Sequence, residues 1–139
     1  MRKLLYITFV FCSISSANTV SAQCDSTSSM CQNHLGTKYI SDGQSYKALL
    51  VGEEVAEFHT TFFGGSKYRI AGCSGDSDGN LEWSMYDVER NLLFTNNDYS
   101  NTPYWDFEFV SSIDVTIEAR LSSLSEGSCA VLMIGFKRQ

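Results

Sequence analysis

Residues Ala56–Cys73, AEFHTTFFGGSKYRIAGC, decide the fold expected for this chain of 139 residues. Apolar and polar side chains alternate on both sides of Gly64-Gly65, which is the period of an antiparallel strand with one buried face. A glycine pair between two such runs is typical of the turn of a β-hairpin. We therefore expect a hairpin here, with further strands of the same fold after it.

The rest of the chain continues this pattern of short alternating runs. The alternation is clearest in Ile113–Leu121, and Cys129–Phe136 is an almost continuous apolar run that we expect in the centre of a sheet. No stretch after residue 22 keeps a helical period for three turns. Strand-like runs at roughly ten-residue spacing are typical of a β-sandwich or barrel. We predict an all-β fold, an antiparallel, jelly-roll-like β-sandwich of seven or eight strands.

The amino-terminal residues have the pattern of a secretory signal peptide. Met1-Arg2-Lys3 precedes an apolar run, and Val20-Ser21-Ala22 provides a small-residue cleavage site. Lipidation of Cys24 is the second interpretation, because Gln23 is a poor residue before an acylated cysteine. We predict a signal peptide over residues 1–22, a cap segment over 23–45 and the sandwich domain over 46–139. Within the cap, Asp25–Leu35 is expected to be short helical or irregular. A small hairpin is expected between Lys38–Ile40 and Tyr46–Val51, with its turn at Asp42-Gly43.

The charge of the processed chain limits the classes of partner. Loss of Arg2 and Lys3 reduces the ten basic residues to eight against sixteen acidic ones, a net charge of -8. Nucleic acids and anionic membrane surfaces both require clustered cations, which this chain lacks. The apolar run at the start is too short to span a bilayer, and no later segment is longer. We expect a periplasmic or extracellular protein without a membrane span in the mature chain.

Four cysteines remain after the predicted cleavage, an even number that indicates disulfide bonds in an exported protein. Three pairings are possible. We favour Cys24–Cys31, which closes a short loop, and Cys73–Cys129, which joins distant strands. A zinc site is disfavoured because no CxxC pair or nearby histidine accompanies these cysteines.

An acidic loop suggests a calcium site. Asp76, Asp78 and Asn80 have the spacing of the first calcium ligands in an EF-hand loop, but Leu81 stands where that loop requires glycine. An EF-hand is therefore excluded. A simpler calcium site on these three residues remains possible as the only cofactor, and turns stabilised by their own side chains are the favoured alternative.

Aromatic and amide side chains meet near the next loop. Tyr99, Tyr104 and Trp105, together with Asn97, form a candidate ligand-binding set, because ring faces pack on sugars while amides bind hydroxyl groups. The favoured alternative places Trp105 in the core with the aromatic residues that follow it on the same face.

The sequence offers little for catalysis. His59 shares a strand face with Glu57, but no HExxH or phosphate-binding loop is present. The favoured function is a non-catalytic binding module whose partner is a protein or a glycan. The alternatives are a small secreted hydrolase or protease-associated regulator that uses His59, and a structural assembly subunit.

Residues Tyr46–Phe136 resemble the bacterial pre-peptidase C-terminal domain, a jelly-roll-like sandwich appended to secreted proteases. The resemblance lies in an aromatic strand that runs into Gly65, in Tyr68-Arg69-Ile70, in Leu81–Asp87 and in Leu93–Asn97. It implies a β-sandwich with an accessory role. The chain carries no protease domain, so such a domain would act alone or by docking to another protein.

Overall fold

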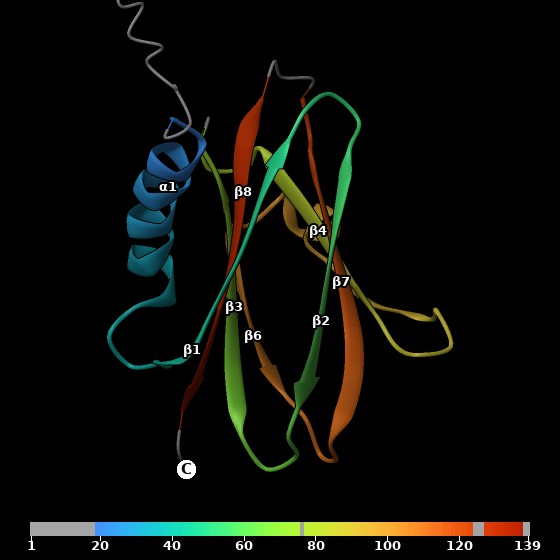
Figure 1. Ribbon diagram of the computed structural model, residues 1–139. Coiled ribbons are helices and arrows are strands. Elements are labelled where there is room, and N and C mark those ends of the chain that lie inside the picture. Colours follow the sequence, from blue (N-terminus) through green and yellow to red (C-terminus); the bar gives the residue numbers. More distant parts are fainter. Residues whose placement is uncertain (1–18, 76, 124–126, 138–139) are drawn as a thin grey trace, which may run out of the picture.

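The computed structural model describes residues 19–75, 77–123 and 127–137, and it shows two packed β-sheets with a helix against one of them (Figure 1). One sheet has the strand order β1-β8-β3-β6 and the other β2-β7-β4-β5, with every pairing antiparallel. This is the connectivity of an eight-stranded jelly roll, so the predicted fold class is confirmed. The elements are α1 (Thr19–Leu35), β1 (Ile40–Leu50), β2 (Val55–Phe62), β3 (Lys67–Ser74), β4 (Leu81–Tyr86), β5 (Leu92–Thr95), the 3-10 helix η1 (Asn96–Tyr99), β6 (Tyr104–Glu108), β7 (Ile113–Leu121) and β8 (Ser128–Lys137).

The period-two alternation places one face of each sheet in the core. Trp83 and Met85 of β4 share one hydrophobic core with Ile70 of β3 and Ile134 of β8, and all four side chains are almost fully buried. The intervening residues of β7, such as Asp114 and Arg120, point to solvent. As predicted, β8 is an interior strand. We call β1-β8-β3-β6 the helix-covered sheet and β2-β7-β4-β5 the open sheet.

The expected hairpin over Ala56–Cys73 is wrong, because β2 and β3 belong to different sheets. The turn at Gly64-Gly65 carries the chain from the open sheet to the helix-covered sheet. A Cβ atom on Gly64 would lie 2.7 Å from the Val110 carbonyl oxygen, and the Gly65 N–H donates to the Phe109 carbonyl at 2.9 Å. The glycine pair therefore serves the close approach of a second loop rather than a hairpin turn.

The predicted small hairpin around Asp42-Gly43 is also wrong. Residues 40–50 form one strand, β1, which pairs with β8 along its length except for a shift in register between Ser41 and Ser45. Gly43 adopts a φ of 82° within this bulge. Asp42-Gly43 therefore bends the strand instead of reversing it. The strand begins within the segment predicted as a cap.

A short helical or irregular stretch is expected over Asp25–Leu35, and the structure shows a longer helix: α1 has 17 residues and packs across β8, β3 and β1 (Figure 1). Between Cys24 and Leu35, its buried residues are Cys24, Thr27, Cys31 and Leu35. Leu35 fits against Gly135, where an added Cβ atom would lie 2.8 Å from the Leu35 Cδ1 atom. Only four of the residues from Cys24 to Leu35 are buried, which explains why the helical period is hard to see in the sequence.

The favoured disulfide pairing is also wrong, because both cysteines of the predicted short loop lie on α1. The structure joins Cys24 to Cys129 and Cys31 to Cys73, so both bonds fasten α1 to the helix-covered sheet. Cys24 and Cys31 are seven residues apart on the helix, about 10.5 Å along its axis, which exceeds the ~7 Å limit between Cα atoms of a disulfide. Both thiols face the sheet because they share one face of the helix.

Within the described ranges, no helix is long and apolar enough to span a bilayer.

Candidate functional site

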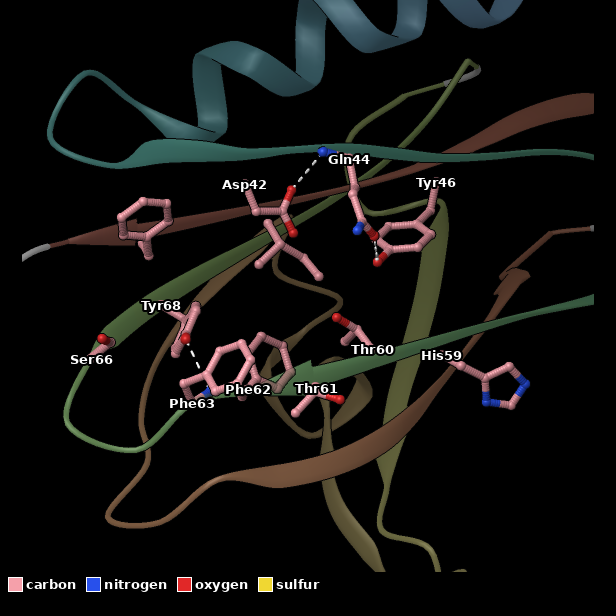
Figure 2. Close-up of a pocket in the computed structure, with 12 residues that line it drawn as sticks. Asp42, Gln44, Tyr46, His59, Thr60, Thr61, Phe62, Phe63, Ser66 and Tyr68 are labelled. Carbon is pink, nitrogen blue, oxygen red and sulfur yellow. Dashed lines mark hydrogen bonds between the residues drawn. The ribbon is translucent and has the colours of Figure 1, made fainter.

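A groove opens between the two sheets along the edge formed by β1 and β2 (Figure 2). Each of these strands lies at the edge of its own sheet, and Figure 1 shows that they separate away from the turn that connects them. The groove has a volume of about 590 Å³, which is within the range of small-molecule and side-chain binding sites. Its lining residues are Asp42, Gln44, Tyr46, His59, Thr60, Thr61, Phe62, Phe63, Ser66, Tyr68, Ile134 and Phe136.

The bulge in β1 supplies the polar wall of the groove. The Gln44 N–H donates to Asp42 Oδ1 at 2.8 Å, and the Gly43 N–H donates to the Ser41 hydroxyl at 3.2 Å. The Tyr46 hydroxyl donates to the Gln44 side-chain oxygen. Figure 2 shows Asp42, Gln44 and Tyr46 reaching from β1 toward the opposite wall. The bulge thus fixes the Asp42 carboxylate at the mouth of the groove.

Aromatic rings form the opposite wall and floor. Phe62 and Tyr68 contact edge to face with ring centroids 4.8 Å apart, and Phe62 stacks on Phe109 at 4.8 Å. The Tyr68 hydroxyl accepts a hydrogen bond from the Phe63 N–H at 3.0 Å. Tyr46 packs on Phe58 at 5.4 Å. These contacts hold the rings in place before any ligand binds, which lowers the entropic cost of binding.

The electrostatics of the groove are those of a site for a cation. Desolvation by the surrounding groups raises the pKa of Asp42, against the lowering effect of the hydrogen bond from Gln44. None of the lining residues is Lys or Arg, and no ion pair involves Asp42 within the described part of the chain. A negative charge beside apolar rings, without a counter-ion, favours a cationic ligand.

His59 lies at the rim and does not contribute a catalytic arrangement to the groove. Its imidazole points away from the other labelled side chains in Figure 2, and its Nδ1 atom lies 3.0 Å from the Thr116 hydroxyl on the outer face of the open sheet. Glu57 is on the same exposed face, two residues away. The hydrolase interpretation of His59 therefore stays a prediction. The arrangement of hydroxyls, amide, carboxylate and rings suits binding.

The structure separates the residues of the predicted ligand-binding set. Tyr99 and Trp105 pack together with ring centroids 4.1 Å apart, beside Phe94. Tyr104 lies on the opposite face of β6, where it contacts Arg69 and His34. Asn97 lines a small hollow on the outer face of the open sheet. A single sugar site from all four residues is not formed, and Tyr99 with Trp105 remains a half-exposed aromatic pair.

Two residues of the predicted calcium set have other partners, and Asp76 lies outside the described residues. Asp78 pairs with His34 Nε2 at 3.0 Å. The side-chain oxygen of Asn80 accepts hydrogen bonds from Ser122 and from both the N–H and hydroxyl of Ser123, at 2.7–3.2 Å. No group of three acidic, histidine or cysteine residues in the described ranges is placed to hold a metal ion.

Sequence reasoning missed the groove because its walls come from four strands. Asp42 and Phe136 are almost a hundred residues apart, and their proximity follows from the pairing of β1 with β8. One signal was available: Asp-Gly inside an otherwise strand-like run indicates a bulge as well as a turn. A bulge at a strand edge often redirects side chains toward a site.

These features define a disulfide-fastened jelly roll with a ligand-sized groove at one edge. No protein-family model matches the chain, and no curated protein matches its sequence. Among solved structures, it is similar to the periplasmic inhibitor of g-type lysozyme, PliG, from Aeromonas hydrophila. The two share 11% sequence identity and a TM-score of 0.52 over 71% of this chain and 88% of the inhibitor. At this identity the similarity shows a shared fold.

Proposed function

We propose that this chain is an exported, non-catalytic protein that binds a lysozyme and inhibits it. The observation that carries the proposal is the similarity to the lysozyme inhibitor, which extends over 88% of that protein. A protein partner is therefore favoured over a glycan. The two disulfide bonds support export, because such bonds persist in oxidising compartments.

The end of the sandwich beside the groove is the proposed contact surface. It carries two exposed apolar side chains, Phe63 at 64% and Val110 at 99% exposure, on neighbouring loops. These loops are joined through the Gly64 N–H, which donates to the Ser112 hydroxyl at 3.3 Å, and through the contact of Gly64 with the backbone at Val110. We call this surface, with the groove, the groove end. Apolar side chains on rigid loops can bury area in a partner with little loss of entropy.

Purified, oxidised protein should inhibit the lysis of bacterial cell walls by at least one lysozyme from a panel of g-type, c-type and i-type enzymes. Inhibition should be stoichiometric, and the same enzyme should bind the immobilised protein. If no enzyme of the panel is bound or inhibited at micromolar protein, the proposed function is wrong.

A matched pair of variants tests the contact surface. Phe63→Asp should weaken inhibition by roughly tenfold or more, because an exposed aromatic anchor at an interface is a typical hot spot. Leu92→Asp is the control, since Leu92 is 54% exposed in β5, at the opposite edge of the open sheet from β2, and lies outside the groove end. Equal losses in both variants, or loss only in the control, would place the contact elsewhere.

A further inference from the structure

We propose that the groove between β1 and β2 receives an arginine side chain of the partner protein, with Asp42 pairing with the guanidinium group and the rings of Tyr46 and Tyr68 packing beside it. The proposal rests on the proposed function only in that the partner is a protein. It assigns the chemical class of the ligand, which the similarity in fold leaves open.

The first argument is the composition of the groove. Asp42 is its one acidic residue, and no lysine or arginine side chain lines it. Asp42 is exposed at the mouth of the groove, and the neighbouring groups that desolvate its carboxylate raise its pKa. A cation that enters the groove gains an ion pair and the faces of aromatic rings together, and such pairs strengthen when they are desolvated.

The second argument is that the chain already builds this environment for one of its own arginines. On the outer face of the helix-covered sheet, the Arg69 guanidinium lies 4.6 Å from the ring centroid of Tyr39 and 4.3 Å from that of Tyr104. Its Nε and Nη2 atoms donate to the two carboxylate oxygens of Asp106 at 2.7 and 3.0 Å. The groove presents the same groups, a carboxylate and tyrosine rings, without an arginine.

The third argument separates arginine from lysine. A guanidinium group is planar, so it can stack on a ring and bind a carboxylate through two hydrogen bonds, whereas an ammonium group is a compact, strongly hydrated point charge. The groove volume of about 590 Å³ exceeds a single side chain. It can therefore also admit the residues that flank the arginine, where the hydroxyls of Thr60 and Ser66 are available to their backbone.

The test uses short blocked peptides and does not depend on the identity of the partner. Ac-Gly-Arg-Gly-amide is titrated into the isotope-labelled protein at millimolar concentration, and amide chemical shifts are followed by NMR. The peptides with citrulline or lysine in place of arginine are the controls. We expect shifts at Gln44, Thr60 and Phe62 with the arginine peptide, at least roughly tenfold weaker binding of the citrulline peptide, and weaker binding of the lysine peptide.

Two variants with the same change of charge complete the test. Asp42→Asn retains the acceptor for the Gln44 N–H and should abolish the shifts. Glu53→Gln lies in the turn between β1 and β2, at the other end of both strands, and should leave binding within about twofold of the original. Unchanged melting temperatures of both variants show that the fold is intact.

The outcomes separate this proposal from the proposed function. Absence of shifts, equal binding of the citrulline or lysine peptide, or binding that survives Asp42→Asn overturns the arginine site, even if a lysozyme is inhibited. If a lysozyme is inhibited, Asp42→Asn should weaken its binding by roughly tenfold and Glu53→Gln by no more than about twofold. Peptide binding without inhibition of any lysozyme would support the groove and contradict the proposed function.

Discussion

Asn96 shows how one side chain extends a β-sheet. The pairing of β5 with β4 ends at Thr95, opposite Ser84. Beyond that point the Asn96 side chain continues the hydrogen bonding: its oxygen accepts from the Trp83 N–H at 2.8 Å, and its Nδ2 group donates to the Leu81 carbonyl at 2.9 Å. Asn96 is fully buried, so water does not reach this place. The Trp83 N–H and the Leu81 carbonyl therefore depend on the Asn96 side chain for their hydrogen bonds.

We expect Asn96→Ala to lower the free energy of unfolding by about 3 kcal/mol, because it leaves a buried N–H and a buried carbonyl without partners. Asn97→Ala is the control and should change stability by no more than about 0.5 kcal/mol, since the Asn97 side chain is exposed. Urea unfolding followed by tryptophan fluorescence measures both. A small effect of Asn96→Ala would mean that water reaches this end of β4.

The Arg69–Asp106 pair gives a prediction on pH. The hydrogen bonds from Arg69 hold the pKa of Asp106 below its ordinary value, against the effect of desolvation. Because the folded-state pKa is lowered, the pair stabilises the protein fully above the unfolded-state pKa of about 3.9, and this contribution is lost as the pH falls through the folded-state value.

Asp106→Asn should therefore lower the free energy of unfolding by about 1 kcal/mol at neutral pH, a value discounted for the exposure of the Asp106 side chain. The difference from the original protein should shrink below a pH of about 4. Glu108→Gln on the same face of β6 is the control, since its pairing with Lys67 is longer, at 3.8 Å, and exposed on both sides. A difference that persists unchanged in acid would contradict the ion-pair explanation.

At the scale of elements, the two disulfide bonds that hold α1 can be mapped by protease digestion. Trypsin leaves Cys24 and Cys31 together on one peptide that ends at Lys38, with Cys73 and Cys129 on two others. The structure predicts that, without reduction, the amino-terminal peptide is linked to both other peptides. The pairing Cys24–Cys31 would release that peptide by itself.

A second digest separates the remaining alternative. Cleavage before Asp25 divides Cys24 from Cys31, and mass spectrometry should then find Cys24 linked to the Cys129 peptide and Cys31 linked to the Cys73 peptide. The opposite combination would mean that α1 lies on the sheet in the reverse direction.

The loop between β3 and β4 gives a prediction about calcium. Asn80 already uses its oxygen to hold the loop between β7 and β8, and Asp78 pairs with His34. We therefore expect millimolar Ca²⁺ to leave the melting temperature unchanged. A calcium site at a hundredfold saturation would add about 2.7 kcal/mol, which a melting curve detects easily. An upward shift that Asp78→Asn abolishes would restore the calcium interpretation.

The elements that the sequence predicts well are those whose burial follows one local period. Ile113–Leu121 alternates inward and outward for nine residues, and β7 has those bounds. The period does not state which sheet a strand joins, so Gly64-Gly65 resembled a hairpin turn although it crosses between sheets. In α1 and at Asp42-Gly43, the local polar residues suggest loops and turns. Packing of these segments against the helix-covered sheet decides their structure instead. Disulfide partners and the groove depend on that packing, so they could not be read from the sequence.

At the scale of the whole molecule, charge bears on how a partner approaches. A net charge of -8 for the predicted mature chain, with six ion pairs within the described residues, leaves many acidic groups without a cationic neighbour. A field of one sign attracts a basic partner over distances of about the Debye length, ~10 Å at 0.1 M salt. Asp42, which forms no ion pair within the described residues, lies in the groove and therefore at the proposed contact surface.

Association with an inhibited lysozyme should therefore slow as salt is added. Between about 20 mM and about 500 mM sodium chloride, we expect the association rate constant to fall by roughly tenfold or more, while the dissociation rate constant changes less. Stopped-flow fluorescence measures the first and a displacement experiment the second. Sucrose at matched viscosity controls for slower diffusion. An association rate that is indifferent to salt would mean that the apolar side chains of the groove end, Phe63 and Val110, govern the encounter without help from the acidic surface.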